Sequence, residues 1–407
     1  MSVTVVGIGA EGWPGLGEPA RRALEAADVV LGAPRQLALL PDLRATPATW
    51  PSPLVPALPG LLAEHADRTL VVLASGDPTF YGVGSAVLAH APGATVLPAP
   101  SSLSLACARL GWAAQDVEVL STVGRPLAAV RAALAPRRRL LVLVPDGEAP
   151  GALAAALTGW GHGDAALTVL GSLGAETESR VDGHAASWAH PPGDALAVVA
   201  VTCPDTPADP LLGRAPGLPD DAYDHDGQLT KAELRALSVT ALRPAPGALL
   251  WDVGGGAGSV GIEWMRHHPA CRAISVEVRE DRAVRIAANA EALGVPGLRV
   301  VVGRAPDALA DLADQEAPDA VFVGGGVSAP GMLGAVHGAL RPGGRLVANA
   351  VTVEGEVALA AFRAEHGGTL RRITVQRAEP VGRFAGWRAL AGVTQLIHRK
   401  DSGRTTA

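Results

Sequence analysis

The sequence is poor in cysteine and has no long apolar run. Its cysteines, Cys107, Cys203 and Cys271, are neither closely paired nor spaced as C-x-x-C, which argues against a disulfide framework and against a cysteine-rich zinc site. Its best apolar runs, such as 140–144 and 195–201, stop well below the ~18 to 20 residues that a membrane span requires. We therefore expect no transmembrane helix and no bound metal.

Basic character is also missing. The chain has 34 Lys and Arg residues against 40 Asp and Glu residues, a net charge of −6, so it lacks the basic surface that nucleic acids attract. Lys231 and Lys400 are its only lysines. The first residues, Met1-Ser2-Val3, place no basic region ahead of the first apolar stretch, unlike a secretory signal. We expect a cytoplasmic protein without a nucleic-acid or membrane partner.

Short β-rich runs alternate with helical stretches along the chain, which is typical of parallel α/β sheets covered by helices. With 407 residues and roughly 150 residues per domain, two or three domains are expected. In the first half, the expected strands are 3–7, 69–74, 94–97, 117–121, 140–144 and 197–201, and the expected helices are 19–27, 82–89, 101–110 and 149–157. The proline-rich stretch 47–59 is expected to be a loop or the start of a helix.

A second alternation begins at Thr230. The segment from Cys203 to Asp221 has few periodic apolar positions and is predicted to be a semi-rigid linker. Beyond it we expect helices at 231–242, 260–267 and 281–293, and strands at 248–253, 273–278, 298–302 and 320–323. The predicted organisation is a domain at 1–203, a linker at 204–217, a second domain at 218–400 and a tail at 401–407.

The most informative local signal is a glycine loop after strand 248–253. Asp252-Val253-Gly254-Gly255-Gly256-Ala257-Gly258 reads D-x-G-x-G-x-G, and the glycines permit a tight turn and close approach of a ligand to the backbone. About 20 residues later, Glu277 ends the next strand with a carboxylate that can accept both hydroxyls of a ribose.

The spacing of this loop bears on its ligand. A nicotinamide dinucleotide site also uses a glycine turn that the ligand can approach closely, but its motif is G-x-G-x-x-G. The earlier third glycine, and the acid before the first, favour S-adenosylmethionine. Asp252 could hold the loop or meet the positively charged end of that ligand. A tight turn without a ligand, and a different nucleotide, remain the alternatives.

Other loops also follow strands. Gly324-Gly325-Gly326 ends a strand at the carboxyl edge, where ligands of open α/β sheets bind. Ser75-Gly76-Asp77-Pro78 follows a buried strand and precedes Phe80 and Tyr81, which a turn alone would not explain in a chain with four Phe and two Tyr. The loops at 7–12, 98–102 and 121–125 could line the same cleft. Ser101 is equally suited to cap a helix.

These residues carry a resemblance to two families. Residues from Val3 to about Val201 resemble the tetrapyrrole methylases, through V-G-I-G at 6–9, S-G-D-P-T-F-Y-G at 75–82 and P-A-P-S-S at 98–102. Residues from Leu218 to about Lys400 resemble the decarboxylating precorrin methyltransferases, through Q-L-T-K-A-E-L-R at 228–235, the glycine loop, G-R-A-P at 303–306, F-V-G-G-G at 322–326 and A-E-P-V-G-R at 378–383.

The resemblance implies an α/β protein in which an N-terminal tetrapyrrole methylase fold of two α/β subdomains is fused to a C-terminal Rossmann-like, seven-stranded methyltransferase fold. It implies methylation of carbons 5 and 15 of a corrinoid precursor in cobalamin biosynthesis, with loss of carbon dioxide from the acetate on ring C. It also implies self-association. The equivalent reactions on a cobalt-containing substrate, and a non-catalytic tetrapyrrole carrier, are the alternatives.

The resemblance further implies two S-adenosylmethionine sites, one in each half. The residues it places against this cofactor are Gly76, Asp77, Pro78, Ser101, Ser102, Thr230, Gly254, Gly255, Gly256, Ala257, Gly258, Glu277 and Ala305. Because the substrate carries many carboxylates, Arg109, Arg125 and Arg383 are expected to anchor it by paired hydrogen bonds, and Gly324, Gly325 and Gly326 to lie beside it. No side chain is assigned as a general base.

Overall fold

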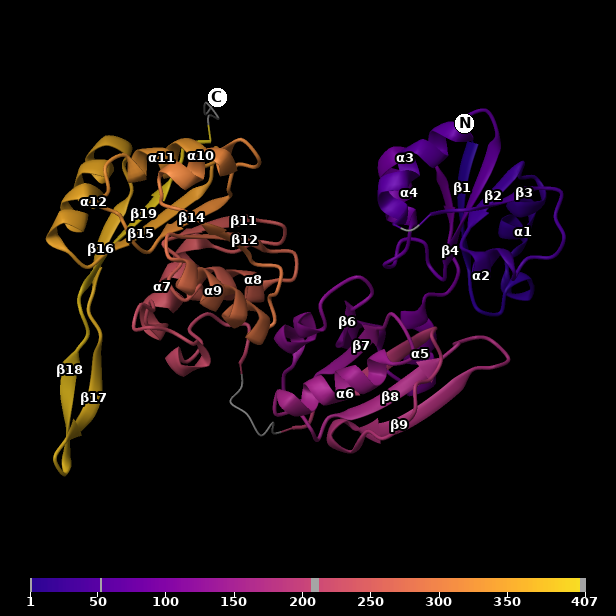
Figure 1. Cartoon of the computed structure of the whole chain (residues 1–407), viewed down its shortest axis with the longest axis horizontal. Coiled ribbons are helices and arrows are strands. Elements are labelled where there is room, and N and C mark those ends of the chain that lie inside the picture. Colours follow the sequence, from indigo (N-terminus) through magenta and orange to yellow (C-terminus); the bar gives the residue numbers. More distant parts are fainter. Residues whose placement is uncertain (1, 52, 206–211, 403–407) are drawn as a thin grey trace. The chain divides into compact units, whose positions relative to one another are not determined.

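The computed structural model describes residues 2–51, 53–205 and 212–402 and divides into two compact units (Figure 1). The N-terminal unit comprises 1–127 and 133–211, and the C-terminal unit comprises 128–132 and 212–407. Within the described residues, no helix is long and apolar enough to cross a membrane. Short 3-10 helices are η1 (Trp13–Gly15), η2 (Ala114–Asp116), η3 (Leu127–Ala133), η4 (Ala185–Ser187) and η5 (Asp220–Ala222).

The N-terminal unit begins with a parallel sheet of order β3-β2-β4-β1-β5. Its strands are β1 (Ser2–Ile8), β2 (Val29–Gly32), β3 (Thr46–Thr49), β4 (Thr69–Ser75) and β5 (Thr95–Leu97), and its helices are α1 (Glu18–Glu25), α2 (Pro34–Leu37), α3 (Leu54–Glu64) and α4 (Gly84–His90). Alternate residues of β1 enter two separate apolar clusters, Val3 and Val5 in one and Val6 and Ile8 in the other. Both faces of the sheet are therefore buried.

The prediction of a loop or helix start at 47–59 is wrong in part. Pro47 lies in β3 and pairs with Val30, while Pro56 and Pro59 lie within α3. Because β3 is an edge strand, a residue without an N–H need not interrupt the ladder there. Pro56 falls in the first turn of α3, where an N–H has no partner within the helix.

The second sheet of the N-terminal unit has the order β6-β7-β10-β8-β9. Its strands are β6 (Val117–Ser121), β7 (Arg139–Leu143), β8 (Ala166–Gly171), β9 (Ser179–His184) and β10 (Ala197–Thr202), with helices α5 (Ser102–Leu110) and α6 (Ala149–Gly159). Only β6 and β7 run parallel, so the expected all-parallel pattern fails here. The two sheets are the two predicted α/β subdomains.

The C-terminal unit is built on a seven-stranded sheet of order β13-β12-β11-β14-β15-β19-β16. Its strands are β11 (Leu249–Val253), β12 (Arg272–Glu277), β13 (Arg299–Val302), β14 (Ala320–Val323), β15 (Arg345–Ala350), β16 (Thr369–Ile373) and β19 (Val393–Arg399). Its helices are α7 (Ala232–Leu242), α8 (Ser259–His267), α9 (Glu280–Ala292), α10 (Asp307–Ala313), α11 (Met332–Ala339) and α12 (Val353–His366). The first five strands are parallel, and β19 is antiparallel to both neighbours. This confirms the expected Rossmann-like, seven-stranded fold.

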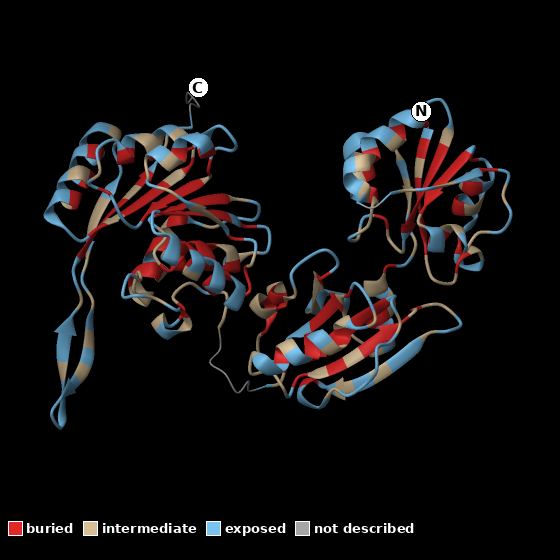
Figure 2. Cartoon of the chain, in the orientation of Figure 1, coloured by how far each residue is buried: buried red, intermediate tan, exposed pale blue. Residues whose placement is uncertain are grey.

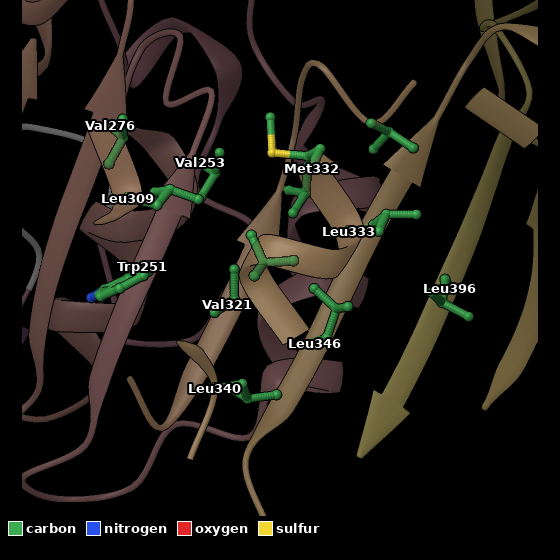
Figure 3. Packing of buried hydrophobic residues seen from close by; sticks show 14 of the residues in the cluster. Trp251, Val253, Val276, Leu309, Val321, Met332, Leu333, Leu340, Leu346 and Leu396 are labelled. Atoms are coloured by element: carbon green, nitrogen blue, oxygen red, sulfur yellow. The ribbon is translucent and has the colours of Figure 1, made fainter. Parts of the chain in front are cut away.

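Both faces of this sheet are buried, as the red strands of Figure 2 show. Trp251, Val321 and Leu346 pack with residues of α11 on one face (Figure 3). Their neighbours Leu250, Phe322 and Val347 belong to the cluster on the other face. Burial on both sides explains why these strands are apolar at nearly every position. Their carboxyl ends, which leave the core, carry the polar and glycine residues of the site.

Between β16 and β19 in the sequence, the chain forms a two-stranded hairpin of β17 (Gln376–Val381) and β18 (Phe384–Ala389). It extends from the C-terminal unit as a thin arm (Figure 1). Val381, Phe384 and Trp387 are exposed, Trp387 by 75%. The arm thus presents large apolar side chains to solvent.

Part of the predicted linker packs against the C-terminal unit. Residues 206–211 lie outside the described residues. Leu212 contacts the apolar cluster on the α8 and α9 side of the sheet, and Leu218 is buried within it.

Candidate active site

The glycine loop joins β11 to α8 and has a conformation that side chains would obstruct. Gly254 and Gly256 have positive φ angles of 74° and 60°. A Cβ atom on Gly254 would lie 2.9 Å from the backbone nitrogen of Gly325, and one on Gly256 would lie 3.0 Å from the carbonyl oxygen of Gln228. The loop is therefore confined between the end of β14 and the segment that precedes α7.

Glu277 ends β12 beside this loop, and its side chain is nearly buried. Its Oε2 accepts a hydrogen bond from the backbone N–H of Gly256 at 2.9 Å, and its Oε1 accepts one from the N–H of Arg279 at 3.1 Å. The carboxylate thus fixes the loop while it lines the cavity described below. A ligand would meet a negative group whose orientation is already set.

Asp252 lies in β11 and is 1% exposed. Its Oδ2 accepts a hydrogen bond from the N–H of Gly261 in α8 at 3.1 Å. Burial raises its pKa to about 7, with a smaller contribution from Glu277, while the bond from Gly261 opposes the rise. Of the two roles considered for Asp252, this geometry favours holding the loop and helix together.

A cavity of about 530 Å³ lies at the carboxyl edge of the seven-stranded sheet. The predicted residues that line it are Thr230, Gly254, Gly255, Gly256, Glu277, Ala305, Gly324, Gly325 and Gly326. Ala257 and Gly258 lie in the turn that begins α8, outside this lining, and Ala257 is buried. The structure therefore brings together loops from β11, β12, β13 and β14 at one site.

Several residues that line this cavity were not predicted from the sequence. Arg282 comes from α9, Asn349 from the end of β15, and Leu390 from the chain between β18 and β19. Asn349 occupies the carboxyl end of a parallel strand, a position that could have identified it. Arg282 and Leu390 carry no comparable local signal.

The N-terminal unit holds a cavity of about 420 Å³. Gly76 and Ser102 line it, and so do residues of the three other loops that were predicted to share a cleft, Gly9, Pro100 and Val123 among them. Phe80 and Tyr81 also line it. Residues missed by the sequence analysis include Arg35, Gln36, Trp50 and Leu196.

The other predicted cofactor residues of this half shape its loops. Asp77 Oδ1 accepts hydrogen bonds from the backbone N–H and the hydroxyl of Thr79, at 2.8 and 2.7 Å. Pro78 follows Asp77 in the same turn, and its carbonyl accepts the N–H of Gly84 at 2.9 Å. Ser101 caps α5, with its Oγ accepting from the N–H of Ser104 at 3.1 Å, which confirms its capping role.

The three predicted arginine anchors have different surroundings. Arg109 forms an ion pair with Glu178 at 2.5 Å, which raises the pKa of the arginine. The guanidinium carbon of Arg125 lies 5.5 Å from the ring centroid of Tyr81, and Arg125 lines a cavity of about 650 Å³ beside α6. Arg383 lies at the tip of the arm, with its guanidinium carbon 5.0 Å from the ring centroid of Phe384. None of the three lines the cavity of either glycine loop.

Comparisons with known proteins match this architecture. Residues 221–400 match the family described as "Precorrin methyltransferase domain", and residues 2–188 match "Tetrapyrrole (Corrin/Porphyrin) Methylases". A solved structure, the C-terminal domain of precorrin-6Y C5,15-methyltransferase from Rhodobacter capsulatus, is 45% identical and covers 46% of this chain and 100% of its own, with a TM-score of 0.43.

Two curated relatives match almost the whole chain. The precorrin-6Y C(5,15)-methyltransferase (decarboxylating) of Sinorhizobium sp is 46% identical over 400 residues, which are 97% of this chain and 95% of the relative. Its namesake from Mycobacterium tuberculosis (strain CDC 1551 / Oshkosh) is 46% identical over 402 residues, 97% of this chain and 98% of the relative. On this near-complete similarity, the chain belongs to the family of decarboxylating precorrin-6Y C(5,15)-methyltransferases.

Proposed function

We propose that this protein methylates precorrin-6Y at carbons 5 and 15 and decarboxylates the acetate on ring C, giving precorrin-8X in cobalamin biosynthesis. The observation that carries the proposal is the glycine loop held by Glu277 at the carboxyl edge of the seven-stranded sheet, in a chain 46% identical over 97% of its length to a relative of that name. The tetrapyrrole substrate follows from the same family membership.

The proposed cofactor is S-adenosylmethionine, bound once in each unit. When bound, it supplies an electrophilic methyl group. In the C-terminal unit, the side-chain-free backbone at Gly254 to Gly256 leaves room for a ligand, and Glu277 and Thr230 present oxygen atoms to the same cavity. In the N-terminal unit, Gly76 and Ser102 line the cavity, and Asp77, Pro78 and Ser101 hold the loops that form it.

We assign methylation of carbon 15 and decarboxylation to residues 218–400, and methylation of carbon 5 to residues 1–203. Each unit has its own cavity, and the sequence motifs of the C-terminal half resemble those of the decarboxylating precorrin methyltransferases. The chain's contribution is to hold the reacting carbon about 3 Å from its partner atom and in line, which can supply most of the catalysis. For this reason the assignment requires no side-chain general base.

The test is incubation of the full chain with precorrin-6Y and S-adenosylmethionine, followed by mass spectrometry. The expected product has gained two methyl groups and lost one carbon dioxide. A parallel incubation with the cobalt-bound substrate distinguishes the two substrate forms. An unchanged substrate mass with bound tetrapyrrole would support the carrier alternative and overturn the proposal.

We also propose that the chain self-associates through its arm. An isolated two-stranded hairpin is marginally stable in water, yet this one exposes Val381, Phe384 and Trp387. Coverage by a second copy would remove these side chains from solvent. Arg388 and Glu379 form an ion pair within the hairpin, so these two charges would not oppose contact with a second copy.

A further inference from the structure

The segment 217–231, here called the cover segment, forms one wall of the cavity in the C-terminal unit. It contains one short 3-10 helix, η5, and otherwise has no regular structure. Gln228, Thr230 and Lys231 line the cavity opposite the glycine loop. Because a Cβ atom on Gly256 would lie 3.0 Å from the carbonyl oxygen of Gln228, the two backbones are in close approach. The position of the cover segment therefore sets the width of the cavity.

Buried polar groups hold both ends of the cover segment. Glu263, which is 1% exposed, accepts hydrogen bonds from the N–H groups of Gly217 and Leu218 at 2.7 and 3.0 Å. Arg235, which is fully buried, pairs with Glu263 and donates to the carbonyl oxygens of Leu218 and Thr230. These bonds fix where the segment begins and where it meets α7.

The middle of the cover segment is held by Tyr223, whose buried hydroxyl donates a hydrogen bond to Oε1 of Glu263 at 3.0 Å, and by the side chain of Asn289 from α9. Asn289 is 4% exposed. Its Oδ1 accepts a hydrogen bond from the N–H of Asp224 at 3.0 Å, and its Nδ2 donates to the carbonyl oxygen of Asp224 at 2.9 Å. The same Nδ2 donates to the carbonyl oxygen of Ala257, in the glycine loop, at 3.0 Å. One amide thus joins the cover segment to the glycine loop.

The chemistry of this position requires an amide. Asn289 uses one acceptor and two donors, which a carboxylate cannot supply and an apolar side chain lacks. The other polar links between α9 and the cover segment are ion pairs of Arg282 with Asp226 at 2.9 Å and of Arg285 with Asp224 at 3.2 Å and with Asp226 at 3.7 Å. These pairs are partly exposed, and ion pairs of that kind contribute little. Asn289 is therefore the main buried polar link between α9 and the cover segment.

We propose that Asn289 is a positioning residue of the cofactor site in the C-terminal unit. It sets the separation between Gln228–Lys231 and Gly254–Gly256 at which the cofactor is held, without lining the cavity itself. The inference rests on the proposed function in that it takes S-adenosylmethionine as the cofactor. It predicts that loss of the amide weakens binding of the cofactor. Once the cofactor is bound, its methyl group and the substrate should still have the reactive geometry.

The test measures decarboxylation by the full chain at saturating precorrin-6Y and varied S-adenosylmethionine. Asn289→Leu is expected to raise KM for S-adenosylmethionine roughly 10-fold or more, since buried hydrogen bonds are lost, and to change kcat by less than about twofold. Asn289→Asp, which keeps the volume of the side chain, is expected to raise KM as well. Methylation at carbon 5 should be unchanged in both variants.

The matched control is Val295→Ala. Val295 is buried in the loop after α9 and belongs to the apolar cluster there, so this variant lowers the thermal midpoint but removes none of the hydrogen bonds that Asn289 makes. Its KM should equal that of the parent chain. An unchanged KM in both Asn289 variants, or an equal rise in Val295→Ala, would overturn the inference. A parent chain that does not decarboxylate the substrate would instead overturn the proposed function.

Discussion

The backbone N–H of Gly256 donates a hydrogen bond of 2.9 Å to Oε2 of Glu277, so the glycine loop after β11 is fixed by the acid that ends β12. The two residues lie on neighbouring parallel strands of one sheet. The same carboxylate accepts the N–H of Arg279, and it lines the cavity. The carboxylate therefore fixes the shape of the loop and also faces the cavity in which we propose that the cofactor binds.

Replacing Glu277 by Ala should weaken cofactor binding in the C-terminal unit alone. Loss of a charged acceptor costs about 1.5 to 3 kcal/mol, or roughly 10- to 150-fold in affinity. Titration calorimetry on the full chain should show one binding event weakened and one retained. Glu316→Ala removes an exposed partner of Arg272 on the same strand β12 and is the control with no expected effect. Normal cofactor binding by Glu277→Ala would show that Glu277 stabilises the loop but does not bind the cofactor.

Gly256→Val should abolish the chemistry of the C-terminal unit. Valine is strained at a φ of 60°, and its Cβ would lie 3.0 Å from the carbonyl oxygen of Gln228. The product of precorrin-6Y should keep the acetate on ring C and lack the methyl on carbon 15, as read by mass spectrometry. Gly334→Ala in α11, where a Cβ meets no atom within 4 Å, is the matched control. Release of carbon dioxide by Gly256→Val would contradict the division of labour.

Asp77→Ala should give the complementary result. Asp77 holds the turn after β4 through two hydrogen bonds to Thr79, and its loss should disturb Gly76 beside it in the cavity of the N-terminal unit. The expected product is decarboxylated and lacks only the methyl on carbon 5. A product lacking both methyl groups would show that the two activities cannot be separated by unit.

Stability should fall with rising pH because of Asp252. Its pKa in the folded chain is about 7, above the ordinary value of 3.8, so the folded state holds the proton more tightly. Its contribution is fully present below pH 3.8 and is lost as pH rises through 7, by an amount on the order of 4 kcal/mol. The side chain in Asp252→Asn cannot ionise, but its amide oxygen can still accept a hydrogen bond from the backbone N–H of Gly261. Denaturant unfolding at pH 5 and pH 8 should show a smaller difference for this variant than for the parent chain.

The sequence predicted the parts of the fold that depend on local patterns. The strand, glycine loop and helix from Leu249 to His267 were identified because apolar periodicity and glycine spacing are local signals. Strand β3 was missed because its proline is tolerated only at a sheet edge, and edge position depends on the whole sheet. The partner of Arg109 was missed because Glu178 is distant in sequence. Charge attraction to a substrate cannot be told from an internal ion pair by residue type alone.

Two histidines of the C-terminal unit, His337 and His398, should destabilise it in acid. The His337 ring lies 4.3 Å from that of His366 and 5.2 Å from that of His398, centroid to centroid. Burial lowers the pKa of His337, and the charges of His366, His398 and Lys400 lower it further. Burial also lowers the pKa of His398, although a hydrogen bond to the backbone of Gly367 opposes this shift. A lowered folded pKa contributes stability that is present above the ordinary value of 6.5 and is lost as pH falls below it.

His337→Phe should therefore unfold less readily than the parent chain at pH 5, relative to pH 7.5, in denaturant titrations. Phenylalanine preserves a ring beside Phe362 and cannot acquire charge. His267→Phe, at an exposed position at the end of α8, serves as the control with no expected effect. An equal acid sensitivity of His337→Phe and the parent chain would contradict the role assigned to this cluster.

Trp387→Glu should disrupt self-association. Trp387 is 75% exposed on the arm, and a charge there would oppose its burial against a second copy. Light scattering coupled to size-exclusion chromatography should show a smaller species than the parent chain at equal concentration. Val284→Glu changes an apolar residue that is 72% exposed on α9 and should leave the mass unchanged. A parent chain that is monomeric in this measurement would contradict the proposal that the arm forms an interface between two copies.

Among the described residues, β19 is the last strand in sequence, yet it lies between β15 and β16 in the sheet. During synthesis on the ribosome, the strands up to β16 emerge before the one that must separate β15 from β16. Until residues 393–399 have been synthesised, the edge of β15 that pairs with β19 has no partner strand. A premature stop codon before Val393 would therefore leave β15 without a partner strand on one edge. We expect such a truncated protein to aggregate or to be degraded by quality-control proteases. The arm, which is made just before β19, lengthens the interval during which that edge is exposed.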